Sequence, residues 1–402
     1  MNRFLIMVPT VLAMLRRQKF IHLMLLAEIA VLTALIVNAL AVVAATQQRW
    51  QTPTGVDEAN IGVIRSIGVV GAANPSTAAQ NLQLLREIPD VRSAAYGAPP
   101  LMNTSTIDVR RDAGARSATT RAYLFQGSQG LTATLGIDVV AGRTFTSDDP
   151  PPAGTLDDNS VLPVLITRKL SQRLFPDSDA LGKVVYTNGN PMRVIGIVRY
   201  LRSQLTGADN DDMGVVSEIR IENENVGGAF TIRAKNGSLG RALPAAAALM
   251  EQHNTGHVQA DVFTLTGKRL EYFASDMAVS RMLLTVIIVL IVMLACGLAG
   301  LTHFLVNKRQ RQIGVMRAVG AMKRDIVFFF ACENLIVSGS GAILGIVMAI
   351  SLHVHLSERY GLAAPTSALV LVTALGMMAV SLSAVALTAG RAVRRTPMTL
   401  FG

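Results

Sequence analysis

The hydrophobic pattern divides the chain into four long apolar segments and one long mixed segment. The apolar segments carry almost no charge and run over about 20–45, 282–306, 326–352 and 367–389. Each is long enough to cross a bilayer as an α-helix, which takes about 20 residues. The first has too long an apolar stretch, after a lead of about twenty residues, to be a cleaved signal peptide. The pattern therefore predicts four transmembrane helices.

The mixed segment, residues 46–278, alternates between strand-like and helix-like stretches. Residues 61–71 and 92–99 have the pattern of strands, and the leucines between them recur at helical spacing. A second helix, at 238–254, precedes a closing strand near the end of the segment. We therefore expect an α+β domain between the first and second transmembrane helices, with β–α–β units at both ends and a β-rich insert at about 99–205.

The distribution of charge indicates the topology. Half of the residues are hydrophobic and only 16% are charged, which is too apolar for an ordinary soluble protein. Residues 46–278 hold 22 Lys and Arg against 23 Asp and Glu, whereas the rest of the chain holds 15 against 4. Because basic residues mark cytoplasmic segments, we expect an interfacial helix at 1–19, the loop 307–325 and the tail 390–402 in the cytoplasm. The domain and the short loop 353–366 are then extracytoplasmic, and nucleic acid is not the expected partner.

The stretch "KRQRQIGVMRAVGAMKRD", from Lys308 to Asp325, is the most basic part of the chain, with six Lys and Arg in eighteen positions. Val315, Val319 and Met322 lie on one face if it is helical. A short helix with apolar knobs and small Gly and Ala residues suits the cleft of a partner protein. A membrane-surface helix that binds anionic head groups is the alternative.

Several stretches together resemble the permease subunit of MacB/FtsX-type ABC transporters, also called type VII or mechanotransmission ABC proteins. They are "GRTFTSDD" and "LPVLITRKLSQRLFPDSDALGKVVYTNGNPMRVIGIV" in the domain, "QIGVMRAVGA" after the second span, "ACENLIVSGSGAILG" in the third and "AGRAVRRTPMTLF" at the C-terminus. The sequence departs from the family pattern at Gln312, where an acidic residue is usual, and at Thr388-Ala389-Gly390-Arg391 in place of Pro-Ala-Arg. The resemblance implies a MacB-like porter carrying the β-rich insert.

The same resemblance implies that ATP and Mg are bound by a separate ABC ATPase subunit, in two copies. The 402 residues contain no GxxxxGK[ST] phosphate-binding loop. We therefore expect neither a cofactor nor a catalytic residue in this chain. The residues implied to contact the ATPase are Gln312, Ile313, Gly314, Val315, Met316, Arg317, Ala318, Val319, Gly320 and Ala321.

The implied assembly is a dimer with a second copy or a paralogous permease, in the bacterial inner membrane. We expect it to export a small molecule or peptide from the periplasm, with a periplasmic adaptor and an outer-membrane channel. The same architecture also serves lipoprotein release and the regulation of cell-wall hydrolases. A membrane sensor is the alternative of another class. It would need a cytoplasmic signalling domain, yet the expected cytoplasmic segments are each under about 25 residues.

A few polar and small residues inside the spans are candidates for helix contacts. Gly341 and Gly345 form a GxxxG pattern beside Gly339, which allows close packing within the subunit or across a dimer. Glu333 and Glu28 are carboxylates within spans, where charge is costly and often functional. For Glu333 we expect a hydrogen bond to a neighbouring backbone group or Arg, and for Glu28 a proton relay is the functional alternative.

Other candidate ligands do not form a site. Neither His353 with His355 nor His253 with His257 has a third ligand, so we expect no metal. The acidic runs 146–158 and 209–212 are rich in Pro and Gly and are expected to be loops. Both cysteines lie in predicted spans, where packing is the expected role.

Overall fold

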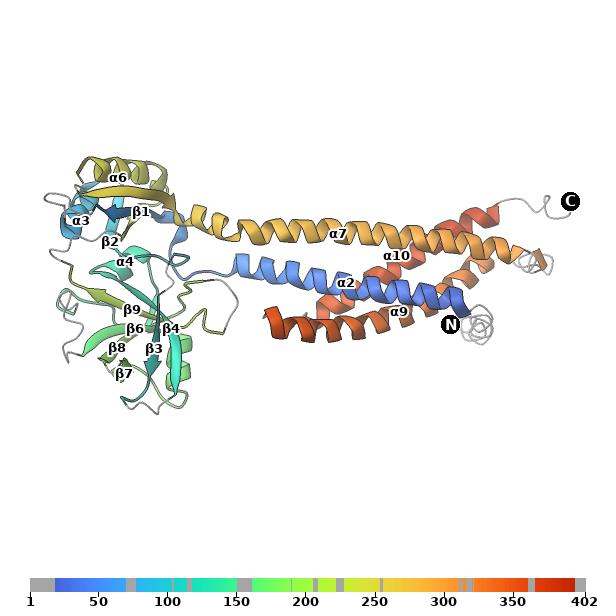
Figure 1. Cartoon of the computed structure of the whole chain (residues 1–402), viewed down its shortest axis with the longest axis horizontal. Helices are drawn as coiled ribbons and strands as arrows, with labels where there is room; N and C mark the ends of the chain where they lie inside the picture. Colours follow the sequence, from blue (N-terminus) through green and yellow to red (C-terminus); the bar gives the residue numbers. More distant parts are fainter. Residues whose placement is uncertain are drawn as a thin grey trace. The chain divides into compact units, whose positions relative to one another are not determined.

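The computed structural model of the chain describes two compact units. One comprises the residues up to Gln48 and those from Asp276 onward, here called the helical unit; the other, Arg49–Ser275, is called the sheet unit. Figure 1 shows the elements of both. The described residues are 19–69, 77–102, 105–113, 118–149, 161–188, 190–204, 209–221, 228–253, 256–310, 314–315, 320, 322–360 and 366–394.

Four long helices make up the helical unit, and each is long and apolar enough to cross a membrane. They are α2 (Lys19–Gln51), α7 (Leu265–Lys308), α9 (Lys323–Tyr360) and α10 (Ser367–Arg394). This confirms the expected class of a membrane protein with four apolar helices and an α+β domain between the first and second. The division between the units falls within the residue ranges of α2 and α7.

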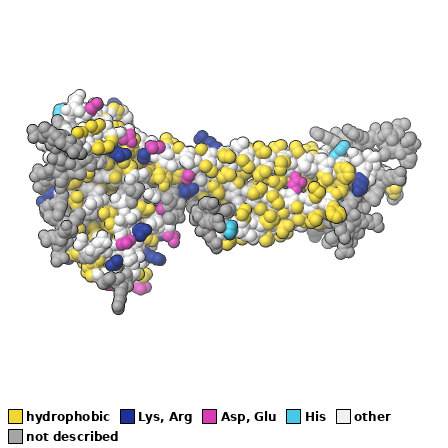
Figure 2. Space-filling view, in the orientation of Figure 1, with side chains coloured by type: hydrophobic (Ala, Val, Ile, Leu, Met, Phe, Trp, Pro, Cys, Tyr) yellow, Lys and Arg dark blue, Asp and Glu magenta, His cyan; other side chains and the backbone are white. Residues whose placement is uncertain are grey.

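The core of the helical unit consists of aliphatic side chains from all four helices. Ile29 and Ile36 of α2 lie against Leu294 of α7, Val337 of α9 and Met377 of α10 in one buried cluster. Many apolar side chains of the same helices are instead exposed, and Figure 2 shows them covering the surface of the helices. An apolar exterior over helices of this length fits a lipid environment.

Gly341 and Gly345 lie where α9 approaches α2. A Cβ atom on Gly345 would sit 2.6 Å from the Ala30 carbonyl oxygen, and one on Gly341 would sit 3.0 Å from Ile29 Cβ. The GxxxG pattern thus brings two helices of the same chain together. Gly339 has no atom within 4 Å of its Cβ position among the described residues.

We expect Gly345→Ala to destabilise the helical unit by about 1–3 kcal/mol, because the added methyl group meets backbone and must push α2 away. Gly339→Ala is the matched control. It should be neutral or stabilise by up to about 1 kcal/mol, since it removes a flexible residue without a clash. Thermal unfolding in detergent measures both. Equal melting temperatures for the two variants would contradict the close approach of α9 to α2.

The sheet unit contains two sheets. The first has the strand order β11-β1-β10-β2, with all neighbours antiparallel. Its strands are β1 (Ile61–Gly68), β2 (Val91–Tyr96), β10 (Gly228–Ala234) and β11 (His257–Thr264). Two amphipathic helices, α3 (Ala78–Glu87) and α6 (Leu239–His253), contribute Leu85 and Ala246 to the same buried cluster as Phe230 of β10.

The second sheet has seven strands in the order β5-β8-β6-β9-β4-β3-β7. Because β7 also pairs with β8, six of the strands close into a small barrel and β5 lies at its side. The strands are β3 (Thr106–Arg110), β4 (Thr119–Ser128), β5 (Val139–Gly142), β6 (Leu162–Thr167), β7 (Val184–Thr187), β8 (Asn190–Val198) and β9 (Gly214–Ile219). Helices α4 (Leu131–Leu135) and α5 (Arg168–Leu174) complete this part.

The insert is longer than expected. The sequence pattern predicts an end at about residue 205, but β9 lies in the centre of the seven-stranded sheet, between β6 and β4. The acidic run before β9, expected to be a loop, is tied to the barrel through its backbone: Thr167 Oγ1 donates to Asp212 O at 2.7 Å. The boundary depends on which strands pair across a long connection. The hydrophobic pattern of one segment does not identify its pairing partner.

Candidate functional site

The segment expected to contact an ATPase connects α7 to α9. Three of its ten residues are described: Gly314 and Val315, which are helical, and Gly320, whose φ of +98° favours glycine. The Val315 side chain is 65% exposed and that of the neighbouring Met322 is 72% exposed. The other seven, Gln312, Ile313, Met316, Arg317, Ala318, Val319 and Ala321, lie outside the described residues.

A buried ion cluster, formed by His22, Arg309 and Glu333, lies immediately beside this segment. Arg309 follows the last residue of α7 and donates from Nη1 to Glu333 Oε2 at 2.8 Å and from Nη2 to Oε1 at 3.0 Å. His22 Nε2 of α2 lies 2.9 Å from the same Oε1. The bidentate pairing is the strongest geometry between a guanidinium and a carboxylate. One carboxylate of α9 thereby joins three helices.

Each member of the ion cluster is at most 7% exposed. The Arg309 guanidinium also lies over the Phe330 ring, 5.9 Å from its centroid. Charges this deeply buried are tolerated only when they are paired and hydrogen-bonded. The cluster therefore fixes how α2, α7 and α9 meet at the end of the helical unit that adjoins the segment.

Two further polar contacts join helices of the bundle, and one of them includes α10. Asn334, next to Glu333, donates from Nδ2 to Ser381 Oγ of α10 at 2.7 Å. Asn38 of α2 donates to the Ala349 carbonyl oxygen of α9 at 3.2 Å. Glu28 lies half-buried in α2 and faces α7, where a Cβ on Gly297 would be 2.6 Å from its Oε1. In the part of the chain that the structure describes, no group of three or more His, Cys, Asp or Glu is placed to hold a metal ion.

A second cluster, here called the helix joint, lies in the sheet unit where α2 ends and α7 begins. Arg269 of α7 donates from Nη2 to the carbonyl oxygens of Trp50 and Thr52, each at 2.5 Å. Its Nη1 donates to Glu58 Oε1 at 2.6 Å. Glu58 belongs to the short helix η1 (Glu58–Asn60), which leads directly into β1. One guanidinium thus ties the ends of both long helices to the first strand.

Aromatic rings enclose the helix joint. Trp50 and Phe273 meet edge to face with ring centroids 5.5 Å apart, and Arg269 lies within 6 Å of both centroids. Phe273 is fully buried and Arg269 is 9% exposed. Partial shielding from water strengthens the charged hydrogen bonds. The guanidinium thus holds the end of α2, the start of α7 and η1 together within the sheet unit.

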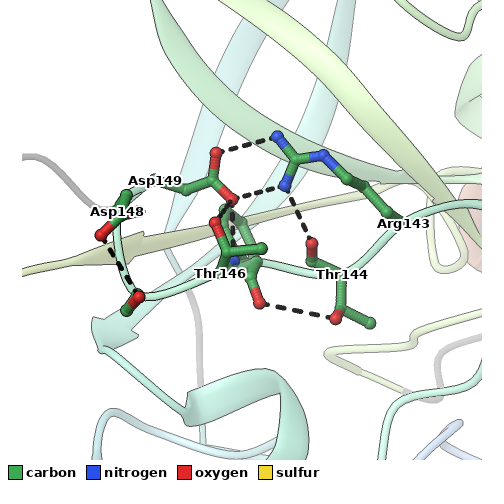
Figure 3. Close-up of polar contacts among 7 residues, drawn as sticks. Arg143, Thr144, Thr146, Asp148 and Asp149 are labelled. Carbon is green, nitrogen blue, oxygen red and sulfur yellow. Dashed lines mark hydrogen bonds and ion pairs between the residues drawn. The ribbon is translucent and has the colours of Figure 1, made fainter.

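The loop after β5 is held by a single carboxylate, as Figure 3 shows. Asp149 accepts from Arg143 Nη1 and Nη2 at 2.5 and 2.9 Å, and from the backbone N–H and hydroxyl of Thr146, both at 2.7 Å. The hydrogen bond from Arg143 is the largest reason that the pKa of Asp149 lies well below its usual range. The carboxylate therefore stays ionised near neutral pH, and the loop keeps its shape.

The sequence did not predict the ion cluster or the helix joint as units. Glu333 was a candidate on its own, but His22 is 311 positions away along the chain, and Arg309 is 24 away. Arg269 is 211 positions from Glu58. A weak signal existed for the ion cluster: His22 and Arg309 stand at the margins of long apolar segments and Glu333 stands within one, where charge has to be paired or exposed.

Comparisons with known proteins match both units. The MacB-like periplasmic core domain family matches residues 25–249, and the FtsX-like permease C-terminal family matches residues 284–398. The chain is 27% identical over 203 residues to a macrolide export ATP-binding/permease protein MacB of Bordetella avium, which covers 48% of this chain and 30% of that protein. It is 25% identical over 215 residues to the uncharacterized ABC transporter permease YknZ of Bacillus subtilis, covering 52% of each.

The chain thus spans about a third of the length of the MacB protein and about half of YknZ. Two solved structures are also similar to part of it. The periplasmic region of MacB from Actinobacillus actinomycetemcomitans has 17% identity and a TM-score of 0.35, over 55% of this chain and 95% of that one. The extracellular domain of YknZ has 16% identity and a TM-score of 0.33, over 50% of this chain and all of that one.

Proposed function

The chain belongs to the MacB/FtsX-type family of ABC transporter permeases, and on that premise we propose that it couples ATP hydrolysis by a separate ATPase subunit to movement of its sheet unit. The observation that carries the proposal is the length of α7. Its 44 residues amount to about 66 Å of helix, roughly twice the thickness of a bilayer core. A single continuous helix thus begins among the residues of the sheet unit and ends beside the proposed ATPase contact.

The proposed cycle starts at the segment between α7 and α9. The exposed Val315 and Met322 supply apolar contacts to the ATPase, and the ion cluster holds the ends of α7 and α9 together so that they move as one. The displacement passes along α2 and α7 to the helix joint. There Arg269 transfers it to η1 and β1. In this proposal ATP and Mg are held by the ATPase, and the chain itself acts mechanically.

The proposed setting is the bacterial inner membrane, with residues 1–19, 307–325 and 390–402 on the cytoplasmic side. This follows from the excess of basic residues in these segments. Two ATPase subunits and a second permease, identical or paralogous, complete the proposed complex. A periplasmic adaptor and an outer-membrane channel would carry the cargo onward.

The proposed cargo is a small molecule or peptide taken from the periplasm. The seven-stranded insert and the "GRTFTSDD" loop favour this reading over lipoprotein release or control of a cell-wall hydrolase. Relatives of this chain are named for macrolide export, which is the kind of cargo that the proposal includes.

We expect Val315→Asp to reduce the amount of ABC ATPase that co-purifies with the detergent-solubilised chain by at least about tenfold. A carboxylate placed in an apolar cleft without a partner costs several times the ~1.4 kcal/mol that a factor of ten represents. The matched control is Val258→Asp on β11, where the side chain is also exposed, at 59%. The captured ATPase is identified by mass spectrometry.

The control should retain the ATPase at the wild-type level. Two results would overturn the proposal: an unmodified chain that recovers no ABC ATPase, or a Val315→Asp chain that recovers as much as the control does.

A further inference from the structure

The sheet unit contains a cavity of about 600 Å³ between its two sheets. Arg92 of β2 and Arg233 of β10 line it from the four-stranded sheet. The seven-stranded sheet contributes α4 with the residues that follow it, and the loop held by Asp149. Pockets that bind small molecules have volumes of about 300–1,000 Å³, so the cavity is of the right size for one.

Hydrogen bonds fix the residues that form the walls of the cavity. Arg233 donates from Nε and Nη2 to Asp57 Oδ2 at 3.1 and 2.7 Å, and from Nη1 to the Ala133 carbonyl oxygen at 3.2 Å. Gly136, with φ +68°, lets this guanidinium approach its backbone, since a Cβ there would lie 3.0 Å from Arg233 Nη1. The loop held by Asp149 forms another part of the wall, and its Phe145 lines the cavity.

The carboxylates in and beside the cavity already have hydrogen-bond or ion-pair partners within the chain. Each oxygen of the buried Glu218 accepts one backbone N–H, from Thr132 at 2.8 Å and Gly130 at 2.9 Å. Asp57, beside the cavity, accepts from Nε and Nη2 of Arg233, and Asp138 pairs with Arg199 at 2.8 Å. Partial burial acts to raise the pKa of Asp57, but hydrogen bonds from Asn60 and Arg233, with the charges of Arg233 and Arg92, lower it overall.

Arg92 is left as the cation for a ligand. The guanidinium groups of Arg92 and Arg233 both act on the carboxylate of Asp57. Of these two groups, Arg233 is hydrogen-bonded to it in the part of the chain that the structure describes. The Arg92 side chain is exposed and lines the cavity. One available guanidinium suits a single negative charge, because Glu218 and Asp138 nearby disfavour a dianion such as phosphate.

We propose that this cavity binds a small organic monocarboxylate with an aromatic or aliphatic body, whose carboxylate meets Arg92 and whose body packs on Phe145 and Ile137. Guanidinium and carboxylate match in shape and charge. The two apolar side chains take up the remainder of the ligand. The site does not depend on the proposed ATPase coupling, since both sheets that form it belong to one compact unit.

The test uses the full chain in detergent, without ATP or an ATPase. The probe is N-acetyl-4-fluorophenylalanine, and its neutral carboxamide is the matched control ligand; binding is followed by broadening of the ¹⁹F signal. We expect the acid to bind at least about tenfold more tightly than the amide, the usual minimum effect of a charged hydrogen bond. An equal concentration of inorganic phosphate should not displace it.

The variant Arg92→Gln should remove the preference for the acid, whereas Arg173→Gln, at an exposed arginine of α5, should leave it unchanged. Phe145→Ala should weaken the binding of the acid and of the amide by the same factor, because it removes only the apolar contact. The proposal is wrong if neither probe saturates, if acid and amide bind alike to the unmodified chain, if phosphate displaces the acid, or if Arg92→Gln still prefers the acid.

Discussion

Replacing Arg309 with Met is expected to lower the free energy of unfolding of the helical unit by about 3–5 kcal/mol, because Glu333 loses its guanidinium while it stays buried. Glu333→Gln should cost a similar amount, since it leaves the Arg309 charge without its carboxylate. These are the largest stability effects that we expect from single substitutions in the chain. Thermal unfolding in detergent is the measurement.

The double variant Arg309→Met with Glu333→Gln tests whether the two residues stabilise the helical unit together or independently. Because it removes both charges, it should be clearly more stable than the sum of the single effects implies, and the coupling should exceed about 1 kcal/mol. Arg281→Met, at an exposed arginine of α7, is the control and should change stability by less than about 0.5 kcal/mol. Additive effects in the double variant would show that Arg309 and Glu333 do not depend on each other.

Replacing Arg269 with Met is expected to uncouple ATP hydrolysis from movement of the sheet unit. The substitution removes three charged hydrogen bonds, to Trp50 O, Thr52 O and Glu58 Oε1, each worth about 1.5–3 kcal/mol. The methionine still fills the space between the aromatic rings, so the sheets keep their cores. In the complex with the ATPase, we expect hydrolysis close to the wild-type rate and transport reduced by at least about tenfold.

Lys268→Met is the matched control for Arg269→Met. Lys268 precedes Arg269 on the same helix and pairs with Glu271 at 3.0 Å, but this ion pair is exposed and contributes little. The control should hydrolyse ATP and transport as the unmodified protein does. Normal transport in Arg269→Met would contradict the helix joint as the point of transfer, and so would a parallel loss of hydrolysis and transport.

The fold class could be predicted from the sequence because the length of an apolar segment and the spacing of its apolar residues are local properties. Each of the four apolar segments is long enough to be recognised by itself, and the short β-branched and apolar runs of β1 and β10 mark strands without reference to their partners. The end of the insert did not follow, because β9 is placed by pairing with β4 in parallel, across more than eighty residues. Sequence pattern carries no information about that partner.

The candidate site also has parts that the sequence predicts and parts that only the structure shows. The segment around Val315 came from an apolar face and a family resemblance, and both are visible in a continuous stretch of sequence. The GxxxG pattern indicated close packing, but only the structure shows that Gly341 and Gly345 face α2 while Gly339 does not. His22, Arg309 and Arg269 were missed because a buried charge is recognised by its partner, and each partner is far away along the chain.

The central claim is that ATPase work moves the sheet unit through the long helices, and a distance measurement in the assembled complex tests it most directly. Cys296 and Cys332 are replaced by Ser, and a spin label is placed at Asp177→Cys, an exposed position beyond α5, in both permeases of the dimer. Pulsed electron resonance then compares the nucleotide-free complex with the ATP-bound one. We expect the distance between the labels to shift with nucleotide in the wild type and to stay constant in Arg269→Met. A wild-type distance that is the same in both states, in a complex that hydrolyses ATP, would contradict the claim.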